Sequence, residues 1–403
     1  MRSDDVTKFA YMQISLPTYF RICKTVTSLR HVAARSVSCS MPEKQVQHFR
    51  AAAPARPPGT ASAIGTRVLD LPRPYLVFLG EASDRPFAKT ALGLRDWAPD
   101  LCLGELASPG ASTSIGLGAL TPAQAYALGA RAVVIGVANV GGAIKQSWIA
   151  PLLECLGAGL DIISGMHGKL ENTPVLQAAA QRHGRRLIDV RTPPPNIPIA
   201  TGRKRSGKRL LTVGTDCALG KKYTALCLER EFRKRGVDAH FRATGQTGIL
   251  IAGSGIPIDA VVADFVAGAA EILSPDAPAT HWDVVEGQGS IFHPSYAGVT
   301  LGLLHGTQPD VIVLCHQAGR ERVMGLEEFR TPGIAEAIEL TLLLARRTNP
   351  WVRCAGVSLN TSHLDPATAR TVLAEHATLL RMPVADPMRG GDELEQLVEA
   401  CLN

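Results

Sequence analysis

The sequence predicts an α/β protein with two domains, a Rossmann-like parallel sheet followed by a P-loop NTPase-type parallel α/β domain. Short apolar runs alternate with amphipathic stretches from Tyr75 to the C-terminus, and 403 residues are enough for two domains. Repeated strand–helix units favour parallel sheets covered by helices on both faces. One apolar run, 210–213, leads into a glycine-framed loop and a lysine, which is the order of elements in a phosphate-binding loop.

The excess of basic residues is confined to the N-terminal part of the chain. Residues 1–66 hold nine Lys/Arg and three Asp/Glu, which accounts for the formal net charge of +6, and the rest of the chain carries 33 residues of each sign. We expect residues 1–66 to be a disordered basic extension with no role in the chemistry. The neutral remainder lacks the charge imbalance that favours nucleic-acid binding, so no nucleic-acid partner is expected.

Two further classes of protein are excluded by the distribution of apolar residues and cysteines. No uninterrupted apolar run reaches the length that crosses a membrane, so no membrane partner is expected. The nine cysteines are scattered without a C-x-x-C pair, which indicates neither a disulfide framework nor a zinc site. We therefore expect a cytoplasmic protein in a reducing setting.

The first domain is expected over residues 67–203, which include a linker to the second domain. Its apolar runs predict five strands, and a helix is expected to open at Thr121-Pro122, where a capping residue precedes a first-turn proline. The linker is the run 191–208, whose Pro, Gly, Arg and Lys residues we expect to be solvated. The five strands are expected at 75–80, 100–104, 132–136, 161–164 and 187–190.

The second domain is expected over residues 204–403. Besides the run at 210–213, apolar stretches predict four more strands, and helical spacing predicts three helices after the first. Glycine-rich or polar residues follow several of these strands, at the edge where open α/β sheets bind ligands. The strands are expected at 238–242, 281–285, 311–315 and 352–359, and the helices at 259–272, 366–379 and 390–402.

The loop between the strand at 210–213 and the next helix is the strongest functional signal. Its backbone N–H groups and the N-terminus of the following helix can hold an anion, while Lys221 reaches over the phosphate oxygens. Five residues separate the two framing glycines, and Lys222 stands where a hydroxyl usually binds Mg²⁺. The expected cofactor-binding residues here are Gly214, Thr215, Asp216, Cys217, Ala218, Leu219, Gly220, Lys221, Lys222, Tyr223 and Thr224.

A second signal is the segment W-D-V-V-E-G-Q-G-S. It places Glu286 at the tip of an apolar strand, where a carboxylate can reach a metal or its water shell. Gly287 and Gly289, on either side of Gln288, let the backbone approach a ligand. Together with the loop, these residues predict a site for a nucleotide-like ligand.

Further polar groups are expected to line the same cleft. His293 follows Glu286 by seven residues and can act as a general base near neutral pH, although a loop histidine is as often plain polar surface. Arg320 can clamp a carboxylate. Asp264 and Glu271 are seven residues apart and are expected on one helix face, which can equally be solvated. The candidate substrate-binding residues are Lys89, Thr90, Asp264, His316 and Arg320.

The loop and the Glu286 segment resemble those of dethiobiotin synthetase. The resemblance implies that Asp216 and Glu286 hold Mg²⁺ if the metal is used, and that Asn360, at the end of a later strand, reads adenine. Ser290 replaces the last glycine of the related Glu-Gly-x-Gly-Gly segment. An ATP-dependent ligase or kinase of this type is one hypothesis, with ATP and Mg²⁺ as cofactors. A non-catalytic nucleotide-binding regulator is another.

The motifs taken together resemble one family with a Rossmann-like N-terminal domain and a dethiobiotin-synthetase-like P-loop domain, long catalogued as a domain of unknown function. They are K-T-A-L-G-L, G-T-D-C-A-L-G-K-K-Y-T, D-F-V-A-G-A-A-E, V-E-G-Q-G-S-I-F-H-P-S-Y and L-G-L-L-H-G-T-Q-P-D. The resemblance covers residues 70–400 and implies D-glutamate N-acetyltransferase activity with acetyl-CoA as co-substrate. Its expected partners are a small-molecule amino-acid substrate and further copies of the chain in a homo-oligomer.

This family resemblance leads to a hypothesis for the catalytic groups. Transfer of an acetyl group to an amine needs a base for the amine proton and donors for the thioester oxyanion. We predict Glu286 or His293 as the base, and Lys221 or the backbone N–H groups of 287–290 as the oxyanion donors. Arg320, together with basic residues of the first domain, is predicted to hold the carboxylates of the amino acid.

Overall fold

The computed structural model describes residues 71–108, 110–137 and 142–403, with the side chains of residues 85 and 86 excepted. The expected basic extension at 1–66 lies outside the described residues. The five-stranded and six-stranded sheets formed by the described residues belong to one compact unit, Ser62–Asn403.

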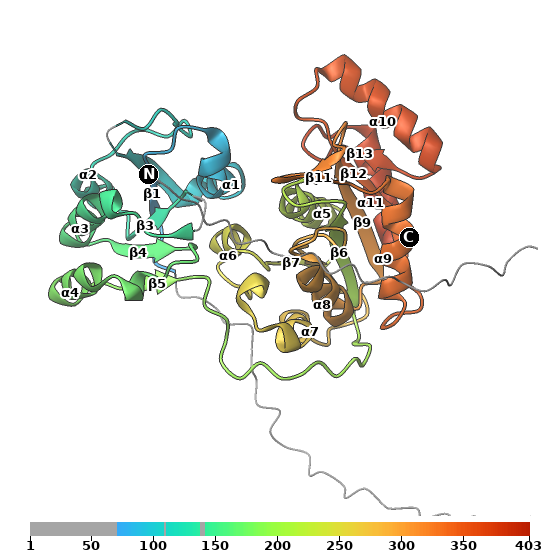
Figure 1. The fold of residues 1–403 in the computed structure, drawn as a ribbon, viewed down its shortest axis with the longest axis horizontal. Helices are drawn as coiled ribbons and strands as arrows, with labels where there is room; N and C mark the ends of the chain where they lie inside the picture. Colours follow the sequence, from blue (N-terminus) through green and yellow to red (C-terminus); the bar gives the residue numbers. More distant parts are fainter. Residues whose placement is uncertain (1–70, 109, 138–141) are drawn as a thin grey trace, which may run out of the picture. The chain divides into compact units, whose positions relative to one another are not determined.

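The first sheet has five parallel strands in the order β2-β1-β3-β4-β5 (Figure 1). Every residue of β1 is buried because helices cover both faces of the sheet, which explains its uninterrupted apolar sequence. In this strand order the chain passes from β1 to β2 on one side of β1 and then crosses to β3 on the other side of β1. The strands are β1 Tyr75–Gly80, β2 Cys102–Ala107, β3 Ala132–Ile135, β4 Asp161–Ser164 and β5 Leu187–Asp189.

The helices of the first part follow the local signals in the sequence. The helix expected at Thr121-Pro122 is confirmed, and its capping box joins Thr121 to Gln124. Another helix stops at Gly184, which adopts the left-handed φ of 60°. The helices are η1 Arg85–Ala88, α1 Lys89–Trp97, η2 Pro99–Leu101, α2 Pro122–Ala127, η4 Gln146–Trp148, α3 Ile149–Gly157, η5 Leu170–Asn172 and α4 Pro174–His183.

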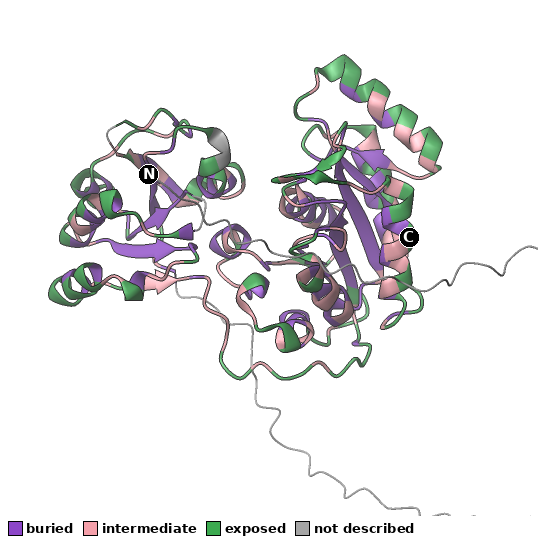
Figure 2. Cartoon of the chain, viewed as in Figure 1, coloured by how far each residue is buried: buried purple, intermediate pink, exposed green. Residues whose placement is uncertain are grey.

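The second sheet has six parallel strands in the order β13-β12-β9-β6-β8-β7, so that the strand leading into the glycine loop lies in its middle. Figure 2 shows most of these strands as buried. A short antiparallel hairpin, β10–β11, follows β9. The strands are β6 Lys208–Gly214, β7 Ala239–Arg242, β8 Trp282–Val285, β9 Val311–Gln317, β10 Arg322–Val323, β11 Leu326–Arg330, β12 Arg353–Asn360 and β13 Val384–Ala385.

The helix expected at 259–272 is wrong over its first half. Val261 and Val262 have extended backbones with ψ of 138° and 137°, and the α-helix begins only at Val266. Asp264 and Glu271 therefore do not share one helix face. The helices are α5 Lys221–Lys234, α6 Gln246–Ala252, η6 Ile258–Ala260, η7 Ala263–Phe265, α7 Val266–Leu273, α8 Ala297–Thr307, α9 Ile334–Ala345, α10 Pro366–Leu380 and α11 Asp392–Leu402.

The basic residues of the run 191–208 differ from the solvated segment expected. Arg205 is buried and donates to the carbonyl of Ser274 at 2.6 Å and to the side chain of Gln308 at 3.0 Å. The neighbouring Arg209, on β6, is also buried and donates to the hydroxyl of Ser274 at 2.7 Å. These guanidinium groups fasten the segment to the second sheet, because each satisfies groups that burial would otherwise leave unpaired.

Helix α6 connects the second sheet to the first. Its Ile249 and Leu250 belong to the same buried core as Val77 and Leu79 of β1. A cross-contact joins the hydroxyl groups of Thr90 on α1 and Thr247 on α6 at 3.2 Å. Helix α1 is thereby held against the segment that follows β7.

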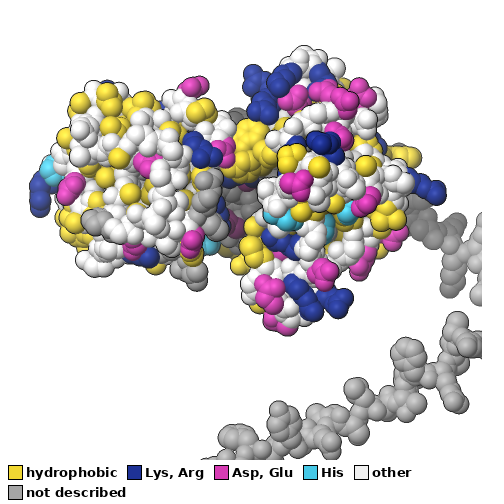
Figure 3. All heavy atoms as spheres, turned by 90° about the horizontal axis from the view of Figure 1, so that it is seen from above, with side chains coloured by type: hydrophobic (Ala, Val, Ile, Leu, Met, Phe, Trp, Pro, Cys, Tyr) yellow, Lys and Arg dark blue, Asp and Glu magenta, His cyan; other side chains and the backbone are white. Residues whose placement is uncertain are grey.

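No helix in the described part of the chain is both long and apolar enough to span a bilayer. On the face shown in Figure 3, acidic and basic side chains are mixed.

Candidate functional site

The glycine loop connects the end of β6 to the start of α5. It bends where Ala218 and Gly220 adopt φ angles of 54° and 108°. A side chain at Gly214 would lie 3.2 Å from the carbonyl oxygen of Cys315, so glycine suits the close approach of the two strands. The first turn of α5 leaves backbone N–H groups without helical acceptors beside the loop, which is the basis of anion binding at such a turn.

Lys221 lies folded across this loop. Its ammonium donates to the carbonyl oxygen of Asp216 at 2.8 Å. Its side chain passes so close to Gly287 that an added Cβ there would lie 3.1 Å from the Lys221 Cδ atom. Burial lowers the pKa of Lys221, and the neighbouring thiols and carboxylates oppose that effect. Gly287, in the segment after β8, therefore packs against the side chain of Lys221, which the sequence predicts to reach over phosphate oxygens.

Asp216 is fully buried and bound on both carboxylate oxygens. Arg320 donates to Oδ2 at 3.0 Å, the backbone N–H of Met324 donates to the same oxygen at 2.9 Å, and the N–H of Cys217 donates to Oδ1 at 2.6 Å. Arg320 also donates to Gln317 at 2.5 Å. The arginine expected to clamp a substrate carboxylate thus pairs with the aspartate expected to hold a metal.

Glu286 lies at the tip of β8, as expected, and is only 4% exposed. Its Oε2 accepts from the backbone N–H groups of Thr244 and Gly245 at 2.9 and 3.0 Å. A Cβ at Gly248 would lie 2.4 Å from the same oxygen, so α6 can approach only through a glycine. Burial raises the pKa of Glu286, and the Lys222 ammonium and the two N–H bonds act in the opposite direction.

Lys222 replaces the hydroxyl that binds Mg²⁺ in common P-loops. Its ammonium lies against Gly93 of α1, where an added Cβ would be 2.9 Å from Nζ. Burial lowers the pKa of Lys222 to about 8, and the Glu286 carboxylate resists the shift, whereas Lys89 adds to it. This residue brings a positive charge to the face of the loop that is turned toward α1.

These residues do not suit a bound Mg²⁺. The ion takes carboxylate, hydroxyl and phosphate oxygens in an octahedral shell. Here an ammonium occupies the hydroxyl position, and the Asp216 carboxylate is paired with a guanidinium. Asp216, Cys217 and His293 do bring one ligand atom each within 4.8 Å of one another. A cation bound there would have to compete with Arg320 for Asp216.

His293 is buried beside the loop and is not a surface residue. Its Nδ1 accepts from the backbone N–H of Ser295 at 3.1 Å, and its ring stacks on Tyr296 with centroids 4.5 Å apart. With Nδ1 used as an acceptor, a neutral ring carries its proton on Nε2. The imidazole is therefore arranged to donate from Nε2.

A cavity of about 630 Å³ lies at the end of β9, and its wall residues His316 and Arg320 contact the loop. His316, at the end of β9, forms part of its wall and is 2.7 Å from the hydroxyl of Thr215. Burial, with smaller contributions from His376 and Arg320, lowers the pKa of His316 to about 4. Asn360 pairs in register with Gln317, so it ends the strand next to this wall. Other wall residues are Arg320, Arg330, Ile334, His376 and Leu379.

Three further candidate residues are Lys89, Asp264 and Gln288. Lys89 is exposed at the start of α1 and lies close enough to Lys222 and Cys217 to affect the pKa of both. Asp264 is exposed on η7, and none of the contacts described above involves it. The side chain of Gln288 donates to the Thr244 hydroxyl at 3.0 Å and so braces the turn that binds Glu286.

Sequence reasoning missed the Asp216–Arg320 pair and the cavity of about 630 Å³. The two residues are 104 positions apart, and no local pattern links them. The cavity is built partly by the β10–β11 hairpin and α10, whose side chains carry no motif.

Comparisons with known proteins agree with this architecture. Residues 198–398 match the P-loop domain of the DUF1611 family, a domain of unknown function, and residues 112–193 match its Rossmann-like N-terminal domain. A crystal structure of a DUF1611 family protein from Anabaena variabilis is 30% identical, covers 81% of this chain and 99% of its own, and superposes with a TM-score of 0.73.

Two curated relatives carry a functional name. The D-glutamate N-acetyltransferase of Tritonibacter scottomollicae is 49% identical, and that of a Pseudoalteromonas species is 46% identical. Each alignment spans 318 residues, which is 79% of this chain and 96% of the relative. The chain therefore belongs to the DUF1611 family and is an N-acetyltransferase, an acyltransferase enzyme.

Proposed function

We propose that the enzyme transfers the acetyl group of acetyl-CoA to the amine of D-glutamate and that the loop 214–220 holds the diphosphate of CoA. The observation that carries the role of the loop is Lys221 folded across a glycine bend at the start of α5. The proposed substrate rests on the names of the two curated relatives.

The charges around the loop suit a diphosphate that is bound and not cleaved. Lys221, Lys222 and the N-terminus of α5 supply positive potential at the loop. Acetyl transfer breaks no phosphate bond, so the site has no phosphoryl charge to stabilise with Mg²⁺. A built-in ammonium at the position of the metal-binding hydroxyl fits this use.

The adenosine of CoA fits the cavity beside the loop. Ile334 and Leu379 supply apolar surface for a base, and Arg330 supplies a guanidinium for the 3′-phosphate. Since this cavity shares His316 and Arg320 with the surroundings of the loop, one ligand can occupy both. On this placement the diphosphate lies between the cavity and Lys222.

The length of CoA limits what the loop residues can do. The pantetheine arm is about as long as four extended residues, roughly 14 Å, and it separates the diphosphate from the thioester. Lys221, Glu286 and His293 all lie around the diphosphate in this arrangement. We therefore assign Lys221 and His293 to phosphate binding and Glu286 to the shape of the loop, in place of the base and oxyanion roles predicted from sequence.

An assay that follows two products tests the proposal against an ATP-dependent ligase or kinase. The full chain is incubated with D-glutamate and either acetyl-CoA or Mg-ATP, and free CoA thiol and ADP are measured. We expect thiol and N-acetyl-D-glutamate to form together, with no ADP. ADP formed in step with D-glutamate consumption, without thiol, would replace this function with the dethiobiotin-synthetase-like one. A lack of turnover with either donor would mean that D-glutamate is not the acceptor of this N-acetyltransferase.

A further inference from the structure

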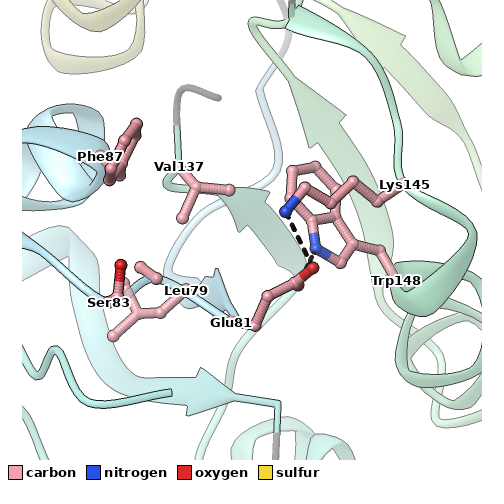
Figure 4. Close-up of a pocket in the computed structure, with 8 residues that line it drawn as sticks. Leu79, Glu81, Ser83, Phe87, Val137, Lys145 and Trp148 are labelled. Carbon is pink, nitrogen blue, oxygen red and sulfur yellow. Dashed lines mark hydrogen bonds and ion pairs between the residues drawn. The ribbon is translucent and has the colours of Figure 1, made fainter. Parts of the chain in front are cut away.

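A second cavity, of about 310 Å³, lies at the carboxyl ends of β1 and β3 in the first sheet (Figure 4). Strand order 2-1-3-4-5 makes the gap between these two strands the point where the chain reverses direction across the sheet. Open α/β sheets bind their ligands at this point. The cavity is therefore placed where the fold itself creates a binding site, on a different sheet from the glycine loop.

The polar wall of this cavity is an ion pair between Lys145 and Glu81, and the buried Trp148 holds the Glu81 carboxylate. Lys145 donates to Glu81 Oε1 at 2.9 Å, and the indole of Trp148 donates to Oε2 at 2.5 Å (Figure 4). The buried Trp148 lies where Gly80 turns with a φ of 51°, and an added Cβ there would be 2.7 Å from the indole nitrogen. Burial alone would raise the pKa of Glu81, but the bonds from Lys145, Trp148 and Ser147 lower it to about 2.

Both charges of the pair remain open to a ligand. The side chain of Glu81 is 31% exposed and that of Lys145 is 44% exposed. Glu81 accepts from Lys145, Ser147 and Trp148, which leaves about one of the four acceptor positions of a carboxylate, and the Lys145 ammonium keeps two protons beyond the one that it gives to Glu81. Leu79, Phe87 and Val137 line the rest of the cavity with apolar surface.

The sequence of the turn after β1 and the volume of the cavity exclude a nucleotide as its ligand. Doubly wound folds hold phosphates at the first strand–helix turn through glycines and a helix N-terminus. Here the turn reads Gly-Glu-Ala-Ser-Asp, which places the Glu81 carboxylate where a phosphate would have to lie. The volume is also at the lower end of the range for small-molecule pockets. A small ligand with an ammonium next to a carboxylate complements the pair.

We propose that this cavity binds the acceptor amino acid, with its α-ammonium on Glu81 and its α-carboxylate on Lys145. This assignment rests on the proposed function for the identity of the amino acid. Phe87 lines the cavity two residues before Lys89, and Lys89 at the start of α1 lies close enough to Lys222 to affect its pKa, so α1 links the cavity wall to the surroundings of the loop.

Calorimetric titration of the full chain, saturated with CoA, tests this assignment. D-glutamate is compared with glutarate, which lacks the amine, and with N-acetyl-D-glutamate, whose amine carries no charge. The variants are Glu81→Gln and Lys145→Met. The matched controls are Glu171→Gln and Lys169→Met, which alter another exposed ion pair, 3.1 Å apart, at η5 in the segment that follows β4. Thermal unfolding of every variant shows whether it is folded.

We expect wild type and both controls to bind D-glutamate at least tenfold more tightly than glutarate or the acetylated product. Glu81→Gln and Lys145→Met are expected to weaken D-glutamate binding by about tenfold or more, because each removes a charge-assisted hydrogen bond. Glu81→Gln should also remove the preference over glutarate. Either result, in a folded variant, supports the assignment.

Binding of D-glutamate within twofold of wild type in both variants would overturn the assignment, as would a wild type that gives no heat with D-glutamate. Failure of the proposed function is a separate result. If the proposed function is wrong, the wild type releases no CoA with D-glutamate. If only the assignment of this cavity is wrong, the wild type releases CoA, and Glu81→Gln and Lys145→Met leave turnover and KM for D-glutamate unchanged.

Discussion

Arg320 donates a hydrogen bond of 3.0 Å to Asp216 and ties the end of β9 to the glycine loop. The same carboxylate accepts from the N–H of Met324, which begins the turn of the β10–β11 hairpin. One buried acidic side chain thus fixes the loop and one wall of the adjoining cavity. In a site for Mg-ATP this carboxylate would face the metal, and here it faces an arginine.

Removal of divalent metal should leave the enzyme active. Because Lys222 and Arg320 supply the positive charge around the loop, we expect the rate of CoA release from acetyl-CoA and D-glutamate to stay within twofold after treatment with EDTA. Thiol release measured before and after dialysis checks this. A loss of activity that Mg²⁺ restores would mean that the loop needs a metal.

The affinity for acetyl-CoA should depend on the charge of Lys222. Its pKa of about 8 in the free enzyme means that the ammonium is present below pH 8 and lost above it. Since the diphosphate is anionic throughout, affinity should fall as the pH rises through 8, by at most about tenfold per pH unit.

Lys222→Arg is the matched variant for this prediction, since a guanidinium stays protonated over the whole range. The decline in affinity, measured by titration calorimetry from pH 6.5 to 9.5, should be smaller in the variant. Identical profiles for the two proteins would assign the titration to another group, such as Lys221.

Glu286→Gln should separate binding from catalysis. If Glu286 shapes the phosphate site, the variant keeps kcat within about fivefold, and any change is in KM for acetyl-CoA. A general base contributes 10²- to 10⁴-fold to the rate, so a loss of kcat of that size would restore Glu286 to the role of base. Steady-state kinetics with each substrate varied in turn distinguishes the two results.

Gly287→Ala should destabilise the fold. An added Cβ would lie 1.7 Å from the carbonyl oxygen of Thr212, a backbone atom that cannot move without disturbing β6. We expect a loss of about 2 kcal/mol or more in the free energy of unfolding, measured with denaturant.

Gly298→Ala is its control, because no atom lies within 4 Å of the added Cβ on α8. Helix propensity predicts no loss of stability, or a gain of up to about 1 kcal/mol. Equal effects of the two substitutions would mean that the approach of Gly287 to β6 is looser than the structure indicates.

Local patterns in the sequence were sufficient to predict most strands and the loop. The runs 75–80 and 161–164 became β1 and β4 with the same ends, and every residue of both strands is buried, as expected for parallel strands that are covered on both faces. The helix expected at 259–272 failed because apolar spacing alone does not report the extended backbone at Val261 and Val262. The ends of strands and helices were therefore predicted less well than their existence.

Long-range pairing could not be predicted. Arg320 was expected to face a substrate, since its sequence neighbours gave no sign that it would pair with Asp216. Arg205 looked like part of a solvated linker, yet it is buried against the carbonyl of Ser274. The cavity beside Glu81 requires β1 and β3 to be neighbours, which depends on the order of strands in the sheet. Such features follow from topology and not from local spacing.

The placement of the CoA diphosphate on the loop is tested most directly by titrating acetyl-CoA, in EDTA, into wild type and Lys221→Ala. Lys234→Ala, on the exposed end of the same helix, is the control. We predict that Lys221→Ala weakens binding by about 10- to 100-fold, as the loss of a charge-assisted hydrogen bond implies, while the control binds as wild type does. Unchanged acetyl-CoA affinity in a folded Lys221→Ala would contradict this placement.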